Sequence, residues 1–293
     1  MFHRNGPLKR RKVEECMMFF AGIVRGIALS CLVVLAGWGA AFAQEAKDFQ
    51  PKVGQEGKDV IWVPTPEALV EKMLDMAKLT PQDYLVDLGS GDGRTVIAAA
   101  KRGARALGIE YNPDMVELSK RNAAMAGVSG RASFVKADIF ESDFSDATVV
   151  TLFLLPSLNV KLRPKLLEMK PGTRVVSNSF DMGDWSADET AERVEGCTSF
   201  CRALLWIVPA KVAGTWSSPQ GELQLEQTFQ MVTGRLKSTT ALTPVSDGRL
   251  AGNRLTFKAG EARYSGTVSG NVIEGTLSAG GSEAAWRATR LAN

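Results

Sequence analysis

The stretch Val-Asp-Leu-Gly-Ser-Gly-Asp-Gly-Arg-Thr-Val-Ile, residues 86–97, joins a short apolar run to an alanine-rich one. Between the two runs, glycine occupies every second position, at Gly89, Gly91 and Gly93. Glycine adopts backbone conformations with positive φ and lets a ligand approach the main chain closely. Because the first turn of a helix presents free N–H groups, a strand, a glycine turn and a helix in this order favour an anion- or nucleotide-binding turn.

The segments around this turn alternate between helical and strand patterns over residues 61–208, which predicts a parallel sheet covered on both faces. Pro66 suits the first position of a helix, and Thr65 is placed to cap it. The expected strands are 84–89, 106–111, 132–140, 147–155, 173–180 and 202–208, and the expected helices are 65–79, 95–103, 113–127 and 159–169.

The pattern changes after Ala210, because residues 213–293 are rich in Gly, Ser and Thr and contain no helical stretch. Two similar segments, 248–255 and 266–273, each place Gly-Asn between alternating apolar runs, which is typical of a tight hairpin turn. The sequence therefore predicts an antiparallel meander over 211–293 that closes into a small barrel or sandwich. The rings of Trp216, Phe229, Phe257, Tyr264 and Trp286 are expected to form its core or its attachment to the first domain, with a ligand pocket as the alternative.

The first 43 residues have the pattern of an export signal: a basic start, an uncharged run over 26–43, and Ala41-Phe42-Ala43 before Gln44. The alternative is an uncleaved anchor, since the run is about long enough to span a bilayer. Either reading leaves the rest of the protein periplasmic, or anchored by 26–43 outside the cytoplasmic membrane; a mispredicted leader would leave it cytoplasmic. Residues 44–60 are polar, lack periodicity and are expected to be a linker to a domain over 61–210.

The net charge and the few histidines and cysteines limit which kinds of chemistry the protein can perform. The chain carries a net charge of +3, but residues 1–43 contribute +4, so the remainder carries −1 and has no basic excess for nucleic acid. His3 is the only histidine, which excludes triad chemistry and His-based zinc sites in the mature chain, and no metal is expected. Cys197 and Cys201 either form a disulfide or are two small buried side chains.

Acidic residues end the strands next to the glycine turn. Glu110, at the end of the second strand, is placed to accept both hydroxyls of a ribose. Asp138, near the end of the third, is placed to accept from an adenine amino group. Tyr111 and Ile139 are placed to enclose the purine ring between them.

The acids within the turn distinguish between nucleotide classes. Asp87 and Asp92 would repel a pyrophosphate, and the spacing G-x-G-x-G differs from the G-x-G-x-x-G of dinucleotide binders. A ligand with a cationic end suits them better. S-adenosylmethionine has an ammonium and a sulfonium group in addition to its ribose and adenine.

At this point the sequence resembles the class I methyltransferases that use S-adenosylmethionine. The segments at 62–66, 87–94 and 147–159 are similar to those of bacterial relatives of the mitochondrial lysine methyltransferases that act on the ATP synthase c-subunit and the adenine nucleotide translocase. The resemblance implies a Rossmann-like, mostly parallel sheet of seven strands. It also implies transfer of methyl groups to lysine side chains of a protein, with S-adenosylhomocysteine as the second product.

Carrying the family's functions over by position gives the expected site. The residues expected to bind the nucleotide are Thr65, Asp87, Gly89, Ser90, Gly91, Asp92, Gly93, Glu110, Tyr111, Asp138, Ile139 and Leu154. Asp181 and Asp184, just after the fifth strand, are the candidates for orienting the acceptor, with a solvated loop as the alternative. For Phe180 and Trp185, burial against the sheet is favoured, with the lining of a lysine channel as the alternative.

The end of the fourth strand, Phe153-Leu154-Leu155-Pro156, lacks the Asn/Asp-Pro-Pro-aromatic motif of amide and base N-methyltransferases. This departure counts against nucleic-acid bases and glutamine amides as acceptors. The resemblance implies a protein partner, for which a membrane or envelope protein is a candidate, and no nucleic acid. Two other classes stay open: an exported module that binds an adenosyl or cationic ligand without catalysis, and a dinucleotide oxidoreductase. The glycine spacing and the lack of a suitable histidine or tyrosine acid count against the oxidoreductase.

Overall fold

The computed structural model describes residues 49–292, which contain a mixed seven-stranded sheet and a closed antiparallel barrel. The strand order of the sheet is β3-β2-β1-β4-β5-β7-β6, with β7 and β6 antiparallel to their neighbours and the others parallel. The strands are β1 (Tyr84–Leu88), β2 (Arg105–Glu110), β3 (Ala132–Lys136), β4 (Val149–Leu152), β5 (Arg174–Asn178), β6 (Glu189–Ala191) and β7 (Ala203–Ile207).

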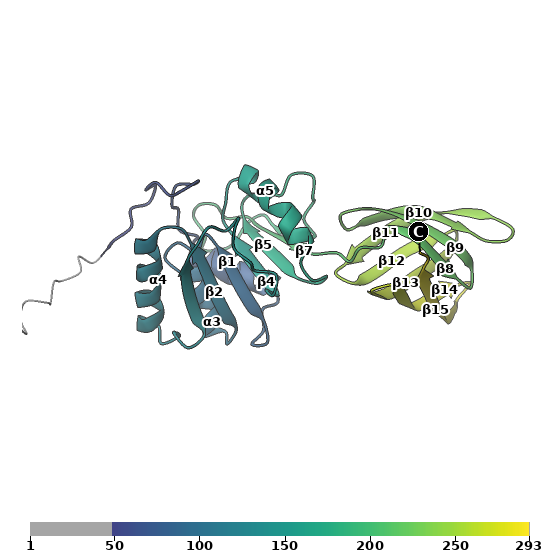
Figure 1. Cartoon of the computed structure of the whole chain (residues 1–293), viewed down its shortest axis with the longest axis horizontal. Coiled ribbons are helices and arrows are strands. Elements are labelled where there is room, and N and C mark those ends of the chain that lie inside the picture. The colour runs from purple at the N-terminus through teal and green to yellow at the C-terminus, as the bar shows by residue number, and fades with distance from the viewer. Residues whose placement is uncertain (1–48, 293) are drawn as a thin grey trace, which may run out of the picture. The chain divides into compact units, whose positions relative to one another are not determined.

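Four helices pack on the sheet: α2 (Glu67–Met76), α3 (Arg94–Lys101), α4 (Pro113–Met125) and α5 (Pro156–Leu167) (Figure 1). Successive strand residues point to opposite faces, so each face has its own core. Leu85 belongs to the core that contains side chains of α2, α3 and α4, whereas Val86 belongs to the core that contains α5. The sheet is therefore covered on both faces, as the alternating sequence pattern predicts.

Local sequence accounts for the helix ends, with one exception. Asn112 accepts hydrogen bonds from the N–H groups of Asp114 and Met115 and so caps α4, while Gly103 and Gly127 follow α3 and α4 with positive φ. The prediction that Thr65 caps α2 is wrong, because Pro66 occupies the cap position and no side chain bonds there. The Thr65 hydroxyl instead accepts a hydrogen bond of 3.2 Å from the side-chain amide of Asn178.

The C-terminal strands, green to yellow in Figure 1, form an eight-stranded meander that closes on itself. They are β8 (Gly214–Ser218), β9 (Gly221–Thr228), β10 (Met231–Lys237), β11 (Leu242–Ala251), β12 (Arg254–Ala259), β13 (Ala262–Ser269), β14 (Val272–Ala279) and β15 (Ser282–Arg290). The two predicted Gly-Asn turns join β11 to β12 and β13 to β14, with Gly252 and Gly270 at positive φ. Inside the barrel, the rings of Phe257 and Tyr264 stack with centroids 4.5 Å apart.

The predicted fold class is confirmed, and the differences are local. The strand β3 ends at Lys136 rather than near residue 140, which leaves Asp138 in the loop that follows. The three-residue β6 was not predicted, because it is too short to show a periodic pattern. The predicted leader lies outside the described residues. Within 49–292, no helix combines the length and apolar character needed to cross a membrane.

Candidate nucleotide-binding site

A cavity of about 450 Å³ lies at the carboxyl ends of the parallel strands. Residues that follow β1, β2, β3, β4 and β5 all line it. Residues 55–65, which precede α2, form a further part of its wall. Residues 55–60 belong to the predicted linker, so part of that polar segment also shapes the cavity. Ligands bind at this edge of open α/β sheets, and the volume is within the ordinary range for small-molecule sites.

The glycine turn presents bare backbone to the cavity. Gly89 and Gly91 line it with φ of +80° and +55°. A Cβ atom on Gly91 would lie 2.7 Å from Nε1 of Trp62, so glycine is required for the indole to pack there. Gly93 does not line the cavity; it precedes α3 with φ of +82°, and a Cβ there would collide with Phe134.

Asp87 is a buried carboxylic acid at the cavity wall. Its side chain accepts a hydrogen bond of 2.6 Å from the hydroxyl of Thr151 on the adjacent strand β4. Burial raises the pKa of Asp87 to about 7, and the negative charges of Glu110 and Asp92 act in the same direction, whereas the Thr151 bond lowers it. A cationic ligand group beside Asp87 would favour its ionised form, so this residue fits the predicted ammonium end.

Glu110 ends β2 and lines the cavity. One carboxylate oxygen accepts a hydrogen bond of 2.9 Å from the Gly91 N–H, and the other accepts one of 2.9 Å from the Asn112 N–H. These bonds fix the carboxylate at the strand end, where its remaining lone pairs can accept from ligand hydroxyls.

Asp138 lies at the same cavity but is already engaged. One oxygen accepts a hydrogen bond from the Phe140 N–H, and the other pairs with Lys58. The Lys58 ammonium lowers the pKa of Asp138 and lies 4.8 Å from the centre of the Tyr111 ring. Because Lys58 belongs to the wall formed by residues 55–65, the pair connects that segment to the loop after β3.

Asp92 and Thr65 both line the cavity, and Arg94 forms hydrogen bonds with both of them. The Asp92 carboxylate receives hydrogen bonds from two nitrogens of Arg94, at 2.6 and 3.0 Å. Arg94 also donates to the main-chain oxygen of Thr65, at 2.9 Å. The arginine therefore joins the start of α3 to the start of α2, and the charge of Asp92 is balanced inside the protein.

Of the other predicted nucleotide contacts, Ser90, Tyr111, Ile139 and Leu154 line the cavity. The Ser90 hydroxyl is buried and has no hydrogen-bond partner among the described residues. It lies beside Gly108, where a Cβ atom would come within 2.5 Å of it. Ser90 therefore requires a glycine on the neighbouring strand β2.

The two candidate acceptor-orienting acids lie outside the cavity lining. The Asp181 side chain accepts from the Gly183 N–H at 3.1 Å, and the exposed Asp184 pairs with Arg163. Trp185 is fully buried, with the Trp206 indole donating to its carbonyl oxygen, which agrees with the favoured interpretation of burial against the sheet. Phe180, in contrast, does line the cavity.

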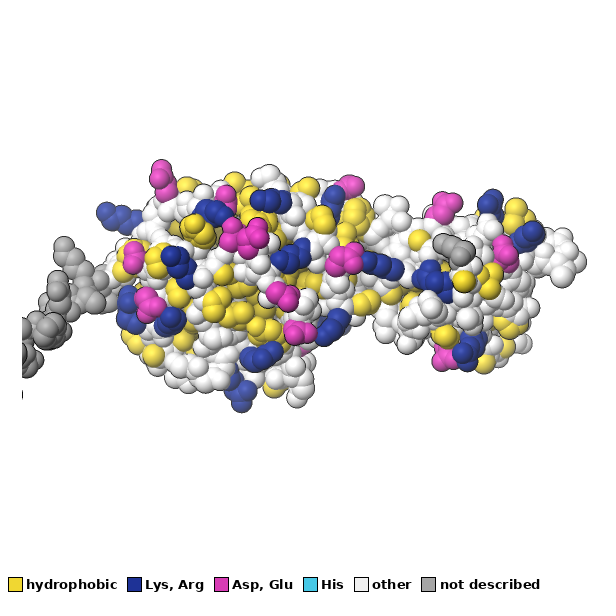
Figure 2. Space-filling model, viewed as in Figure 1, with side chains coloured by type: hydrophobic (Ala, Val, Ile, Leu, Met, Phe, Trp, Pro, Cys, Tyr) yellow, Lys and Arg dark blue, Asp and Glu magenta, His cyan; other side chains and the backbone are white. Residues whose placement is uncertain are grey.

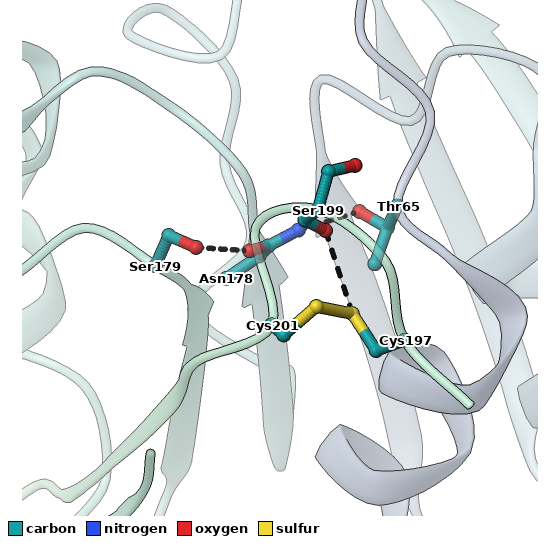
Figure 3. The surroundings of a disulfide bond; sticks show 6 residues. All are labelled: Thr65, Asn178, Ser179, Cys197, Ser199 and Cys201. Atoms are coloured by element: carbon teal, nitrogen blue, oxygen red, sulfur yellow. Dashed lines mark hydrogen bonds between the residues drawn. A yellow bond between two sulfur atoms is a disulfide. The ribbon is translucent and has the colours of Figure 1, made fainter. Parts of the chain in front are cut away.

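Cys197 and Cys201 form a disulfide, which settles the alternative that the sequence left open. Figure 3 shows this bond near the Thr65, Asn178 and Ser179 side chains. Asn178, the last residue of β5, donates to the Thr65 hydroxyl and accepts from the Ser179 hydroxyl at 2.8 Å. The start of α2 and the end of β5 are thus joined beside the disulfide.

Several cavity residues were not among the predicted site residues, and they include Lys58, Trp62, Phe153 and Phe200. Trp62 lies in the 62–66 segment on which the family resemblance rests, so a sequence signal was available for it. Lys58 and Phe200 lie in segments without periodicity, and only the folded chain brings them to the cavity.

On the face drawn in Figure 2, acidic and basic side chains are interspersed, without a patch of one sign.

The cavity fits an adenosyl ligand with a cationic end. Its lining combines the carboxylates of Asp87, Glu110 and Asp138 with the bare backbone of Gly89 and Gly91. Among residues 49–292, no group of three or more His, Cys, Asp or Glu side chains is arranged to hold a metal ion.

Comparison with known proteins agrees with this interpretation of the cavity. The model of a family described as the ANTKMT methyltransferase domain matches residues 87–189. A protein-lysine N-methyltransferase of Saccharolobus islandicus is 47% identical over 140 residues, which cover 47% of this chain and 87% of the relative. The human ATP synthase c-subunit lysine N-methyltransferase is 37% identical over 136 residues, or 46% of this chain and 58% of the relative.

Two further matches are methyltransferases that are described as acting on other substrates. The mouse adenine nucleotide translocase lysine N-methyltransferase is 40% identical over 118 residues, covering 40% of this chain and 51% of the relative. A structure described as an RNA methyltransferase from Salinibacter ruber, in complex with S-adenosyl-L-homocysteine, is 49% identical. That match has a TM-score of 0.48 and covers 51% of this chain and 96% of the other. The chain thus spans only about half of the two mammalian relatives.

The sheet order, the glycine turn with its acids, and these relatives define an enzyme class: the methyltransferases that depend on S-adenosylmethionine. Within that class, the chain belongs to the family of the ANTKMT methyltransferase domain.

Proposed function

We propose that the protein transfers methyl groups from S-adenosylmethionine to lysine side chains of a protein. The observation that carries this proposal is the convergence of Asp87, Glu110 and Asp138 on one cavity that apolar side chains also line. The relatives named as protein-lysine, ATP synthase c-subunit and adenine nucleotide translocase lysine methyltransferases support the choice of acceptor.

Each of these three acidic residues binds a different part of the nucleotide. Asp87 binds the cationic amino end of the nucleotide, Glu110 holds the ribose, and Asp138 accepts from the adenine amino group after Lys58 moves aside. When bound, the nucleotide supplies a methyl group on a positively charged sulfur. The protein aligns the acceptor nitrogen with that group for in-line transfer and excludes water.

The acceptor amine must lose its proton, because the ordinary lysine pKa is near 10.4. The residues after β4 and β5 that line the cavity include Phe153, Leu154, Leu158 and Phe180. Such apolar walls disfavour the charged ammonium and so lower the pKa of the amine. No histidine is needed for this step. Asp181 and Asp184 remain candidates for orienting the acceptor from outside the cavity.

The transfer is tested with S-adenosylmethionine carrying a radioactive methyl group. The full chain is incubated with membrane, envelope and soluble protein fractions of its host, and in parallel with host RNA. We expect label that is sensitive to protease and resistant to nuclease, with methyl-lysine as the labelled product of hydrolysis. Label in RNA alone would contradict a lysine acceptor, and the Asp87→Asn variant is expected to lose the labelling.

The proposal also places the folded domain outside the cytoplasmic membrane. The leader pattern over 1–43 supports this, and so does the Cys197–Cys201 disulfide, because disulfides persist in oxidising compartments. The intact mass of the protein purified from its host is the measurement. A mature chain that begins at Gln44 and contains the oxidised cysteine pair is expected, whereas an unprocessed, reduced chain in the cytosol would contradict export.

A further inference from the structure

Three phenylalanines from three separate segments contact one another in the lining of the cavity. Phe153 follows β4, Phe180 follows β5, and Phe200 precedes β7; all three line the cavity. Their ring centroids are 5.2 Å apart for Phe153–Phe200, 5.9 Å for Phe153–Phe180 and 6.2 Å for Phe180–Phe200. These three rings are called the aromatic mouth below.

Phe200 differs from the other two phenylalanines in its solvent exposure and in its backbone conformation. Its side chain is 44% exposed although it contacts both of the other rings. Its φ is +51°, a region that costs a residue with a Cβ atom energy and persists only where the surroundings hold it. Some feature of the chain must therefore keep this aromatic residue at the edge of the cavity.

A disulfide lies directly beside Phe200 in the chain. It closes a loop from Cys197 to Cys201, with the two Cα atoms 5.6 Å apart, and Phe200 is the residue next to its second cysteine. On the other side of the loop, the Arg202 guanidinium donates to the Ser179 carbonyl at 2.7 Å, and the Ser179 N–H donates to the Arg202 carbonyl at 2.7 Å. Phe200 is thus held between a covalent bond and a strand-end connection that also positions Phe180.

We propose that the Cys197–Cys201 disulfide holds Phe200 as the third wall of a lysine-selecting aromatic mouth, which makes Phe200 a specificity-determining residue. This inference rests on the proposed function and identifies how the site selects its acceptor. The neighbouring lining residues Leu155 and Leu158 are also apolar. Rings and aliphatic side chains contact the methylene stem of a lysine and remove water from its amine, but they offer no hydrogen bonds to the edges of a nucleobase.

The experiment measures acceptor binding and turnover separately. The full chain is assayed with an end-blocked peptide containing a single lysine, and peptide affinity is also measured calorimetrically in the presence of S-adenosylhomocysteine. In Phe200→Ala we expect the peptide KM and the peptide Kd to rise roughly tenfold, with S-adenosylhomocysteine affinity unchanged. Leu242→Ala, an exposed apolar residue of the barrel, is the control and should leave all three values unchanged.

The disulfide is tested by removing it in two ways. Dithiothreitol treatment of the wild type and the double variant Cys197→Ser/Cys201→Ser should each raise the peptide KM in the same direction as Phe200→Ala. Reduction should not raise it further in Phe200→Ala, because the ring that the bond positions is already absent. Phe200→Tyr keeps a ring at this position and is expected to retain the wild-type KM.

The outcomes separate this inference from the proposed function. If the wild type methylates the peptide but neither Phe200→Ala nor reduction changes KM or Kd, the aromatic mouth is not the selecting element. If the wild type binds S-adenosylhomocysteine but methylates RNA and no lysine peptide, both the acceptor assignment and this inference are overturned.

Discussion

The main-chain N–H of Gly91 donates a hydrogen bond of 2.9 Å to the carboxylate of Glu110, which ties the glycine turn after β1 to the end of β2. The second oxygen of Glu110 is held by the Asn112 N–H. The N–H groups of Gly91 and Asn112 thus share the Glu110 carboxylate, which lies nineteen residues after Gly91, and the position of the turn depends on a side chain of the next strand. The contact explains why the glycines and the acid occur together in this sequence.

Replacing Glu110 by alanine removes both this connection and the acceptor for ribose hydroxyls. We expect Glu110→Ala to weaken S-adenosylmethionine binding by about 1–3 kcal/mol, as for the loss of a hydrogen-bond partner. Isothermal titration calorimetry is the measurement. Glu117→Ala, which removes an exposed carboxylate of α4 paired with Lys120, is the control and should bind as the wild type does. Equal affinities for the two variants would exclude Glu110 from the nucleotide site.

The pKa of Asp87 predicts how nucleotide affinity depends on pH. Because burial raises this pKa to about 7 in the free protein, Asp87 is mostly protonated at pH 6 and mostly ionised at pH 8. A cationic ligand prefers the ionised form, so affinity for S-adenosylmethionine should rise with pH up to about 7, by as much as roughly tenfold per unit. Titrations between pH 5.5 and 7 avoid deprotonation of the ligand's own ammonium group.

Two controls separate this effect from other pH responses. Asp87→Asn should bind weakly, with no increase between pH 5.5 and 7. Methylthioadenosine, which lacks the ammonium and sulfonium charges, should bind the wild type without this pH dependence. A steep pH dependence for that uncharged ligand would assign the titration to another group.

The pair between Lys58 and Asp138 predicts a second pKa change. Lys58 lowers the pKa of Asp138, so Lys58→Met should return that pKa toward the ordinary value, as measured by NMR titration of the carboxyl carbon. A depressed carboxyl pKa stabilises the fold above the unfolded-state pKa, and this stabilisation is lost as pH falls through the folded-state value. Any excess stability of the wild type over Lys58→Met should therefore disappear in acid. Lys120→Met is the control and should leave Asp138 unchanged.

Gly91→Ala tests the requirement for bare backbone in the turn. The new Cβ would sit at a φ of +55° and 2.7 Å from the Trp62 indole nitrogen. We expect a loss of about 2 kcal/mol in the free energy of unfolding, measured by denaturant titration. Gly130→Ala is the matched control, because a Cβ there meets no atom within 4 Å and its φ is not in the left-handed region. If both variants are equally stable, the turn tolerates a side chain.

Local sequence predicts most of the fold here because each signal depends on neighbouring residues. The alternation of apolar strands and amphipathic helices, and the Gly-Asn turns of the barrel, require only short-range geometry. The prediction for Thr65 was wrong because its hydroxyl bonds to Asn178, which is 113 residues away in the chain. For Phe180 and Trp185 the sequence left a channel and burial both open, because aromatic side chains of a core and of a channel look the same in a sequence; Trp185 is buried and Phe180 lines the cavity.

The sequence by itself determined the glycine turn, the strand-end acids Asp87 and Glu110, and the order of elements that makes them meet at one edge of a sheet. Parallel strands guarantee that meeting, since all their carboxyl ends lie on the same side. Only the tertiary structure decided that Asp138 is already paired with Lys58 and which rings surround the cavity. Those contacts join segments without periodic patterns, so their partners are fixed by packing and not by local preference.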